Sequence, residues 1–152
     1  MSATLEDWVS SGVLRRHETS AEEIADLLGV VDRDLSDCRT PGLSSDWRLA
    51  IAYNGALQAA KAALAAAGYR VAGGEKGHHY RLVESLRYTA DLPAGDIDLL
   101  QQMRKKRNLS DYELAGAVSD SEADEMAGLA RRVLDTVVRW LEAEHPDLFR
   151  SR

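Results

Sequence analysis

The chain has 152 residues, of which 45% are hydrophobic and 29% charged, with a formal net charge of −6. This length suits one domain with its own core, and this balance excludes an intrinsically disordered chain. The negative net charge also excludes attraction of nucleic acid by the overall field, so such a contact needs a local basic patch. The single cysteine, Cys38, excludes an internal disulfide and fits a reducing compartment.

The chain shows no targeting or membrane-spanning pattern. Residues 1–8 do not lead from a basic segment into an apolar one, so we expect no secretory signal and a cytoplasmic location. The longest apolar-rich stretch, residues 49–67, is interrupted by Asn54, Gln58 and Lys61. These polar side chains make it a poor membrane span, and we expect no contact with a membrane.

The first two elements are predicted to be helices. Residues 5–14 form a short amphipathic pattern that Gly12 weakens. Residues 19–22 are typical of a capping box, in which Thr19 caps the next helix and Glu22 bonds back to it. That helix carries apolar residues at spacings of three and four, and Pro41 lies in the segment that ends it.

Residues 44–46 are predicted to cap a long helix that reaches about Ala67 and ends at Gly68. This helix is apolar on most of its circumference, so it belongs in the middle of a bundle. A glycine-rich loop at residues 71–77 follows, and then helices at 78–88 and 96–115.

The last helix shows one continuous apolar stripe and closes at Pro146. Together these patterns predict an all-α, single-domain bundle of about five helices, without a sheet, over residues 1–152. Within it, residues 1–18 form an N-terminal extension or short helix, and residues 19–145 form the core.

The helix predicted at 96–115 contains the one break in the apolar pattern. Leu100 and Met103 start a stripe, and steps of three and four carry it to polar residues: Arg104, Arg107, Asn108 and Asp111. Buried charge is costly unless it is paired, and such conflicts are expected at functional sites. The other interpretation is a solvated helix face with an ordinary surface ion pair between Arg107 and Asp111.

Residues 103–112 resemble the signature helix of HEPN domains (higher eukaryotes and prokaryotes nucleotide-binding). That helix has an arginine, a polar residue that is often asparagine, a histidine four to six residues further on, and a tyrosine nearby. The resemblance extends to Tyr53 and Asn54 in the alanine-rich helix, and to the glycine-histidine step at residues 77–79. In all it covers residues 20–142, and it implies a HEPN-like bundle.

Residue by residue, Arg107 matches the signature arginine and Asn108 the polar residue after it. Tyr112 matches either the histidine position or the neighbouring tyrosine, so the signature histidine is absent. The resemblance places Arg104 beside Arg107 on a phosphate.

His78 or His79 would supply the missing imidazole if the loop before them packs beside the signature helix. This makes Arg104, Arg107, Asn108, Tyr112, His78 and His79 the candidate catalytic residues.

The resemblance implies a component of a bacterial two-component system, of the toxin–antitoxin or defence type, that acts as a metal-independent endoribonuclease. In that chemistry the 2′-hydroxyl of RNA attacks the adjacent phosphodiester, within a cleft formed across a homodimer. The implied partner is a nucleotidyltransferase-type antitoxin.

Two alternatives stay open. One is a non-catalytic module that binds a nucleotide or docks a nucleotidyltransferase, with Tyr112 as the acceptor of a nucleotidyl group. The other is a structural adaptor in which the polar cluster orders a dimer interface. Ligand spacings for a metal and a phosphate-binding glycine fingerprint are both missing from the sequence, so we expect neither a metal nor a cofactor.

Overall fold

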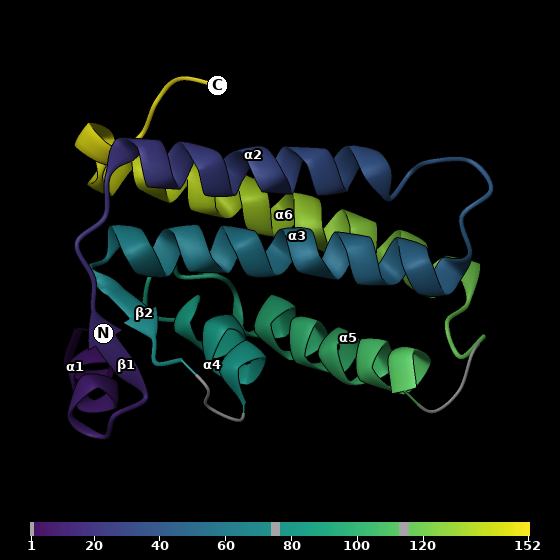
Figure 1. Cartoon of the computed structure of the whole chain (residues 1–152), viewed down its shortest axis with the longest axis horizontal. Helices are drawn as coiled ribbons and strands as arrows, with labels where there is room; N and C mark the ends of the chain where they lie inside the picture. The colour runs from purple at the N-terminus through teal and green to yellow at the C-terminus, as the bar shows by residue number, and fades with distance from the viewer. Residues whose placement is uncertain (1, 74–76, 113–115) are drawn as a thin grey trace.

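The computed structural model describes residues 2–73, 77–112 and 116–152, with the side chains of residues 2–3 and 109–112 left out. The described residues confirm the predicted helical bundle, since they form six α-helices and one short two-stranded sheet (Figure 1). The helices are α1 Ser2–Ser10, α2 Ala21–Asp37, α3 Ser45–Ala66, α4 His78–Ser85, α5 Ala94–Tyr112 and α6 Asp120–Glu144, followed by a 3₁₀ turn at Pro146–Leu148.

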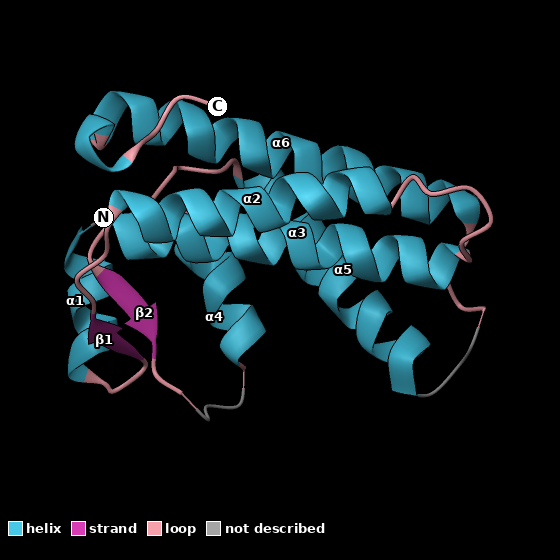
Figure 2. Ribbon diagram, turned by 45° about the horizontal axis from the view of Figure 1, so that its top comes forward, coloured by secondary structure: helices cyan, strands magenta, loops and turns pink. Residues whose placement is uncertain are grey.

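The centre of the bundle is α3, as its sequence predicts. It contacts α2, α6, α4 and α5, and most of its residues from Leu49 to Ala66 are buried. Its many alanines let the neighbouring helices approach closely. Figure 2 shows α2, α3 and α6 as one layer, with α4 and α5 projecting from its lower side.

Hydroxyl caps set where three of these helices begin. The Ser20 side chain accepts a hydrogen bond from the amide of Glu23, and Ser44 and Ser119 cap α3 and α6 in the same way. The predicted capping box at Thr19 and Glu22 is therefore one residue out of register. Instead, the Thr19 hydroxyl donates to the Glu23 carboxylate at 2.6 Å.

The expectation that the chain has no sheet is wrong. Strand β1 (Leu14–Arg16) pairs with β2 (Tyr69–Val71) in an antiparallel ribbon. The first helix ends at Ser10, earlier than predicted, because Gly12 adopts a φ of +83°, a left-handed conformation that turns the chain into β1. Three-residue strands are too short to show an alternating pattern in the sequence.

The helices α4 and α5 lie side by side below α3 (Figure 1). In α5, Ile97, Leu100 and Met103 are buried against the core, as the first part of its apolar stripe predicts. An ion pair between Lys106 and Glu122, 3.2 Å apart, ties the later part of α5 to α6. The anchored helix therefore holds the charged residues that follow Met103 in fixed positions.

Candidate functional site

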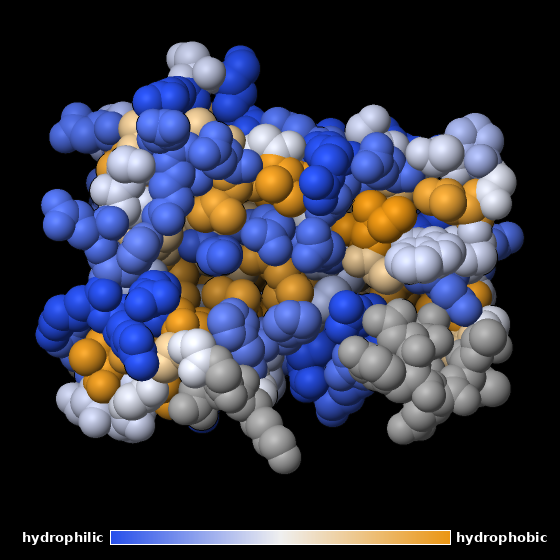
Figure 3. Space-filling view, viewed as in Figure 1, coloured by the Kyte–Doolittle hydropathy of each residue, from blue (hydrophilic) through white to orange (hydrophobic). Residues whose placement is uncertain are grey.

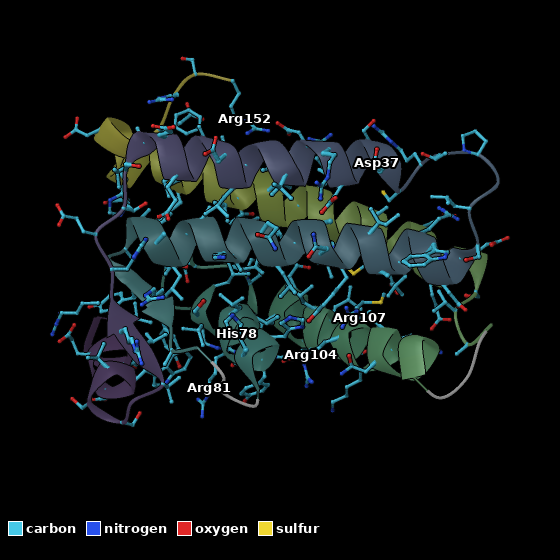
Figure 4. The ribbon with its side chains drawn as sticks, viewed as in Figure 1. Asp37, His78, Arg81, Arg104, Arg107 and Arg152 are labelled. Atoms are coloured by element: carbon cyan, nitrogen blue, oxygen red, sulfur yellow. The ribbon has the colours of Figure 1, made fainter. Side chains whose placement is uncertain are left out.

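The break in the α5 pattern produces a cluster of half-buried polar side chains beside α4. After the buried Met103, the side chains of Arg104, Arg107 and Asn108 are all partly buried. Residues three and four apart on a helix lie on one face, so these three point the same way. In Figure 4, Arg104 and Arg107 lie below α3, on the side where α4 and α5 are neighbours.

The N-terminus of α4 brings two histidines to this cluster. Gly77, just before the helix, has a φ of +82°, a left-handed conformation that suits glycine. The chain therefore turns sharply and starts α4 with His78 and His79. Both line a pocket of about 250 Å³ with Tyr80, Arg104 and Asn108. We call this the α4–α5 pocket.

Arg104 is held in place from both helices. Its Nε donates a hydrogen bond to Gln101 Oε1 at 2.8 Å, and its guanidinium lies 5.7 Å from the centre of the Tyr80 ring. Gln101 in turn donates to the Tyr80 carbonyl at 3.2 Å and to the Glu84 carboxylate at 3.0 Å. This chain of contacts joins α5 to α4 and orients the arginine towards the pocket that they share.

The floor of the cluster is Tyr53 of α3, which is 1% exposed. The Arg107 guanidinium lies 5.9 Å from the centre of its ring, and the His79 ring lies at the same 5.9 Å separation. Burial raises the pKa of the Tyr53 phenol, so this side chain acts as an apolar platform and not as a base. One aromatic ring thus positions both an arginine and a histidine.

Burial and nearby positive charges favour the neutral form of both histidines. Burial lowers the pKa of His79 below its ordinary value of 6.5, and the positive charges of Arg107 and Arg104 lower that pKa further. Burial, helped by the charge of Lys61, also lowers the pKa of His78. An imidazole that is neutral at pH 7 can accept a proton, while the arginines beside it carry positive charge.

Five of the six predicted catalytic residues therefore lie together: Arg104, Arg107, Asn108, His78 and His79. The sixth, Tyr112, is the last residue of α5, and its side chain lies outside the described residues. Asp111, the other member of the predicted ion pair with Arg107, has its side chain outside them as well.

Sequence reasoning missed the polar residues of a second pocket, of about 720 Å³, between α2, α3 and α5. We call it the α2–α3 pocket. Its lining includes Arg33, Asp34 and Trp47. It also includes Arg107, so this pocket shares one residue with the polar cluster on α5. A signal was present, because Asp34 lies on the same face of α2 as Val31 and Leu35, which are buried.

No protein-family model matches the chain, and no match is found among curated proteins or solved structures. Within residues 2–73, 77–112 and 116–152, acidic, histidine and cysteine side chains do not gather in groups of three or more that could hold a metal ion. The helices in those ranges include none that is long and apolar enough to cross a membrane.

Proposed function

We propose that the α4–α5 pocket binds a phosphate of RNA and cleaves the chain there without a metal ion. The observation that carries this proposal is the position of His78 and His79 beside Arg104 and Asn108. Residues 103–112 lack the histidine of the helix they resemble, and α4 brings two imidazoles beside Arg104 and Asn108. The arrangement therefore combines a proton acceptor with cations that suit a phosphate.

In this proposal His79 is the general base. Its neutral imidazole takes the proton of the 2′-hydroxyl while the 2′-oxygen attacks the adjacent phosphorus. The bond from phosphorus to the 5′-oxygen breaks, and the 5′-oxygen takes a proton from water. The products are a 2′,3′-cyclic phosphate and a 5′-hydroxyl. His78 is not assigned the role of general acid, because its lowered pKa favours the neutral form, which has no proton to give to the 5′-oxygen.

The arginines stabilise the negative charge that develops on the phosphate oxygens during the attack. Arg104 is oriented by Gln101 and Tyr80 before any ligand binds. Arg107 lies over Tyr53 and donates to Asn108 Oδ1 at 3.4 Å. A guanidinium that is already held in position does not have to reorganise during the reaction, which is why such groups contribute strongly to catalysis.

We further propose that the chain is a diverged HEPN domain in a two-component toxin–antitoxin or defence system. It would work as a homodimer in the cytoplasm, with α5 in the interface, and a nucleotidyltransferase would serve as its antitoxin. Modification of Tyr112, one turn after Asn108, would place a bulky charged group close to Arg104 and Asn108. What supports this is the resemblance of residues 103–112 together with the polar cluster on α5.

The test is cleavage of a labelled single-stranded RNA by the purified protein in the presence of EDTA. The expected result is cut RNA with 2′,3′-cyclic phosphate and 5′-hydroxyl ends. Intact RNA, with the protein free of any partner, would contradict the enzymatic proposal. RNA that binds in a gel-shift assay but stays intact would assign the site to the non-catalytic binding module.

A further inference from the structure

The α2–α3 pocket has a different chemistry from the α4–α5 pocket. It is lined by two carboxylates, two arginines, a serine, an amide and a large aromatic side chain, together with the apolar residues Ala50 and Ile51. In Figure 3 hydrophobic residues form a broken band along α2 and α3, while the surface near the α4–α5 junction is hydrophilic. A planar, partly apolar ligand with polar edges fits such a pocket better than a bare phosphate does.

The deepest polar group of the pocket is the carboxylate of Asp34, a residue that is only 4% exposed. Its Oδ1 accepts hydrogen bonds from Arg33 at 3.2 Å and 3.0 Å, and its Oδ2 accepts one from Asn54 Nδ2 at 2.8 Å. Because Oδ1 already accepts two bonds and Oδ2 only one, Oδ2 can accept one more. The carboxylate is therefore held at the pocket wall with one acceptor site left for a ligand.

The mouth of the pocket carries two exposed side chains. Trp47, in the first turn of α3, is 63% exposed, although large aromatic side chains are usually buried. The Arg33 side chain is 61% exposed even though it pairs with Asp34. An exposed indole offers a stacking surface for a base, and an exposed guanidinium offers donors for carbonyl and ring nitrogen atoms.

We propose that the α2–α3 pocket binds a guanine base. Guanine is the base whose N1–H and N2 amino group lie side by side, so the edge that faces Asp34 carries only donors, and one of them can bond to Oδ2. Its O6 and N7 then accept from Arg33, the pairing that arginine makes with guanine in nucleic-acid complexes. Trp47 stacks on the ring face.

The other bases present a mismatched edge to the same groups. Adenine and cytosine place an unprotonated ring nitrogen beside their amino group, and that nitrogen would face the negative carboxylate. Uracil has a single N–H between two carbonyl oxygens, which the carboxylate would also repel. Only guanine presents an edge made of donors alone to the buried Asp34 carboxylate.

The position of Arg107 adds a consequence that rests on the proposed function. Arg107 lines the α2–α3 pocket and also packs on Tyr53 beside His79. A guanine held over Ala50 would therefore be a neighbour of the phosphate bound at the α4–α5 pocket. In an RNA substrate, the pocket would select sites that have guanine next to the cleaved bond.

The first test measures binding of guanosine, adenosine, cytidine and uridine 5′-monophosphates to the whole protein by calorimetry. Guanosine monophosphate should bind about tenfold or more tightly than the other three, the discrimination expected of one bidentate contact. Arg33→Ala and Asp34→Asn should each reduce this preference. Trp47→Ala should weaken the binding of all four nucleotides, because stacking does not distinguish the bases. Arg15→Ala, which removes an exposed arginine on β1, should leave both the preference and the affinities unchanged.

Thermal unfolding of each variant separates loss of binding from loss of fold. If Asp34→Asn does not fold, the variants of the exposed residues Arg33 and Trp47 still test the inference. Equal affinity for the four nucleotides, an undiminished guanine preference in Arg33→Ala, or unchanged nucleotide affinity in Trp47→Ala would each overturn the inference.

The second test uses uridine oligoribonucleotides with and without one guanosine. Tighter binding of the guanosine-containing chain shows that the pocket takes the base from RNA, and binding of the mononucleotide alone shows that it takes a free nucleotide. Guanine binding without cleavage would leave this inference standing and remove the proposed function. Cleavage that depends neither on guanine nor on Trp47 would leave the proposed function standing and remove this inference.

Discussion

The two pockets differ in their charge. Arg107 connects them, because it lines the α2–α3 pocket and donates to Asn108, which lines the α4–α5 pocket. The described residues that line the α4–α5 pocket include two histidines and Arg104 and no acidic side chain. The α2–α3 pocket instead includes Asp34 and Asp46 beside Arg33. A pocket of cations and neutral imidazoles suits a phosphate, whereas a pocket that contains a fixed carboxylate discourages one.

In the proposed function, this difference gives an acidic protein a local site for nucleic acid. The chain carries a net charge of −6, so its overall field does not attract RNA. The proposal therefore assigns the affinity to short-range contacts, with a phosphate on one side of Arg107 and a base on the other. Variants on each side of Arg107 test whether one side binds the phosphate and the other side binds the base.

The largest expected effect is the loss of the base. His79→Ala should lower the rate of RNA cleavage by about 10²–10⁴-fold, the range of general-base catalysis. His78→Ala is the matched control, because its ring lies 6.1 Å from that of His79 and yet it is assigned no proton transfer. Single-turnover cleavage assays measure both. Equal losses in the two variants would mean that the pocket as a whole is needed, and not one imidazole.

Removal of a phosphate-binding cation should have the next largest effect. Arg104→Ala should lower the cleavage rate by about 10²-fold, as expected for loss of one preorganised charge-stabilising donor. Arg104→Lys should recover part of that loss, because it keeps the charge without the planar fork. Arg131→Ala, an exposed arginine on α6, provides the control. A rate for Arg104→Ala within twofold of the unmodified protein would contradict the role of this residue.

The lowered pKa of His79 predicts how the cleavage rate depends on pH. Its folded-state pKa is lowered below 6.5 by burial and by the nearby arginines, so it stays neutral where an ordinary histidine is already protonated. The cleavage rate should therefore hold as the pH falls to 6.5 and decline only below it. A pH–rate profile of kcat/KM for the free enzyme checks this. An acid limb centred above 6.5 would show that the titrating base is another group.

The smallest effect concerns the other pocket. Trp47→Ala removes an exposed side chain, and the free energy of unfolding should change by no more than about 0.5 kcal/mol. Cleavage of RNA that lacks guanine should also be unaffected at saturating protein concentration, because Trp47 does not line the α4–α5 pocket. Chemical denaturation and the cleavage assay measure these two quantities. A marked loss of stability would reassign Trp47 to the fold.

Much of the fold was predictable, because capping serines and apolar spacings determine where α2, α3 and α6 begin and which faces they bury. The strands were not, because Leu14 pairs with Val71 across a long separation in sequence and each strand has three residues. The break in the apolar pattern after Met103 indicated where the α5 side chains change from buried to partly buried. The packing of His79 against Tyr53 depends on the turn at Gly77. The sequence therefore supported only a conditional prediction, that His78 or His79 reaches the cluster if the loop before them packs beside α5.

The same reasoning, applied more widely, would have found Asp34. It interrupts the buried stripe of α2 as Arg104 and Arg107 interrupt that of α5. Its partner Asn54 lies on α3, and a hydrogen bond between two helices cannot be deduced from either helix alone. Charged residues that interrupt an apolar stripe therefore occur beside both pockets. Only the three-dimensional structure showed that Arg107 lines one pocket and bonds to Asn108 of the other.

The central claim is that a histidine from α4 replaces the one missing from α5, and rescue by free imidazole tests it most directly. The measurement is cleavage of a labelled RNA in EDTA by the unmodified protein, by His79→Gly, and by His79→Gly with added imidazole. We predict that cleavage is lost in the variant and partly restored by imidazole, to the same 2′,3′-cyclic phosphate product. Full cleavage by His79→Gly without imidazole would contradict the account.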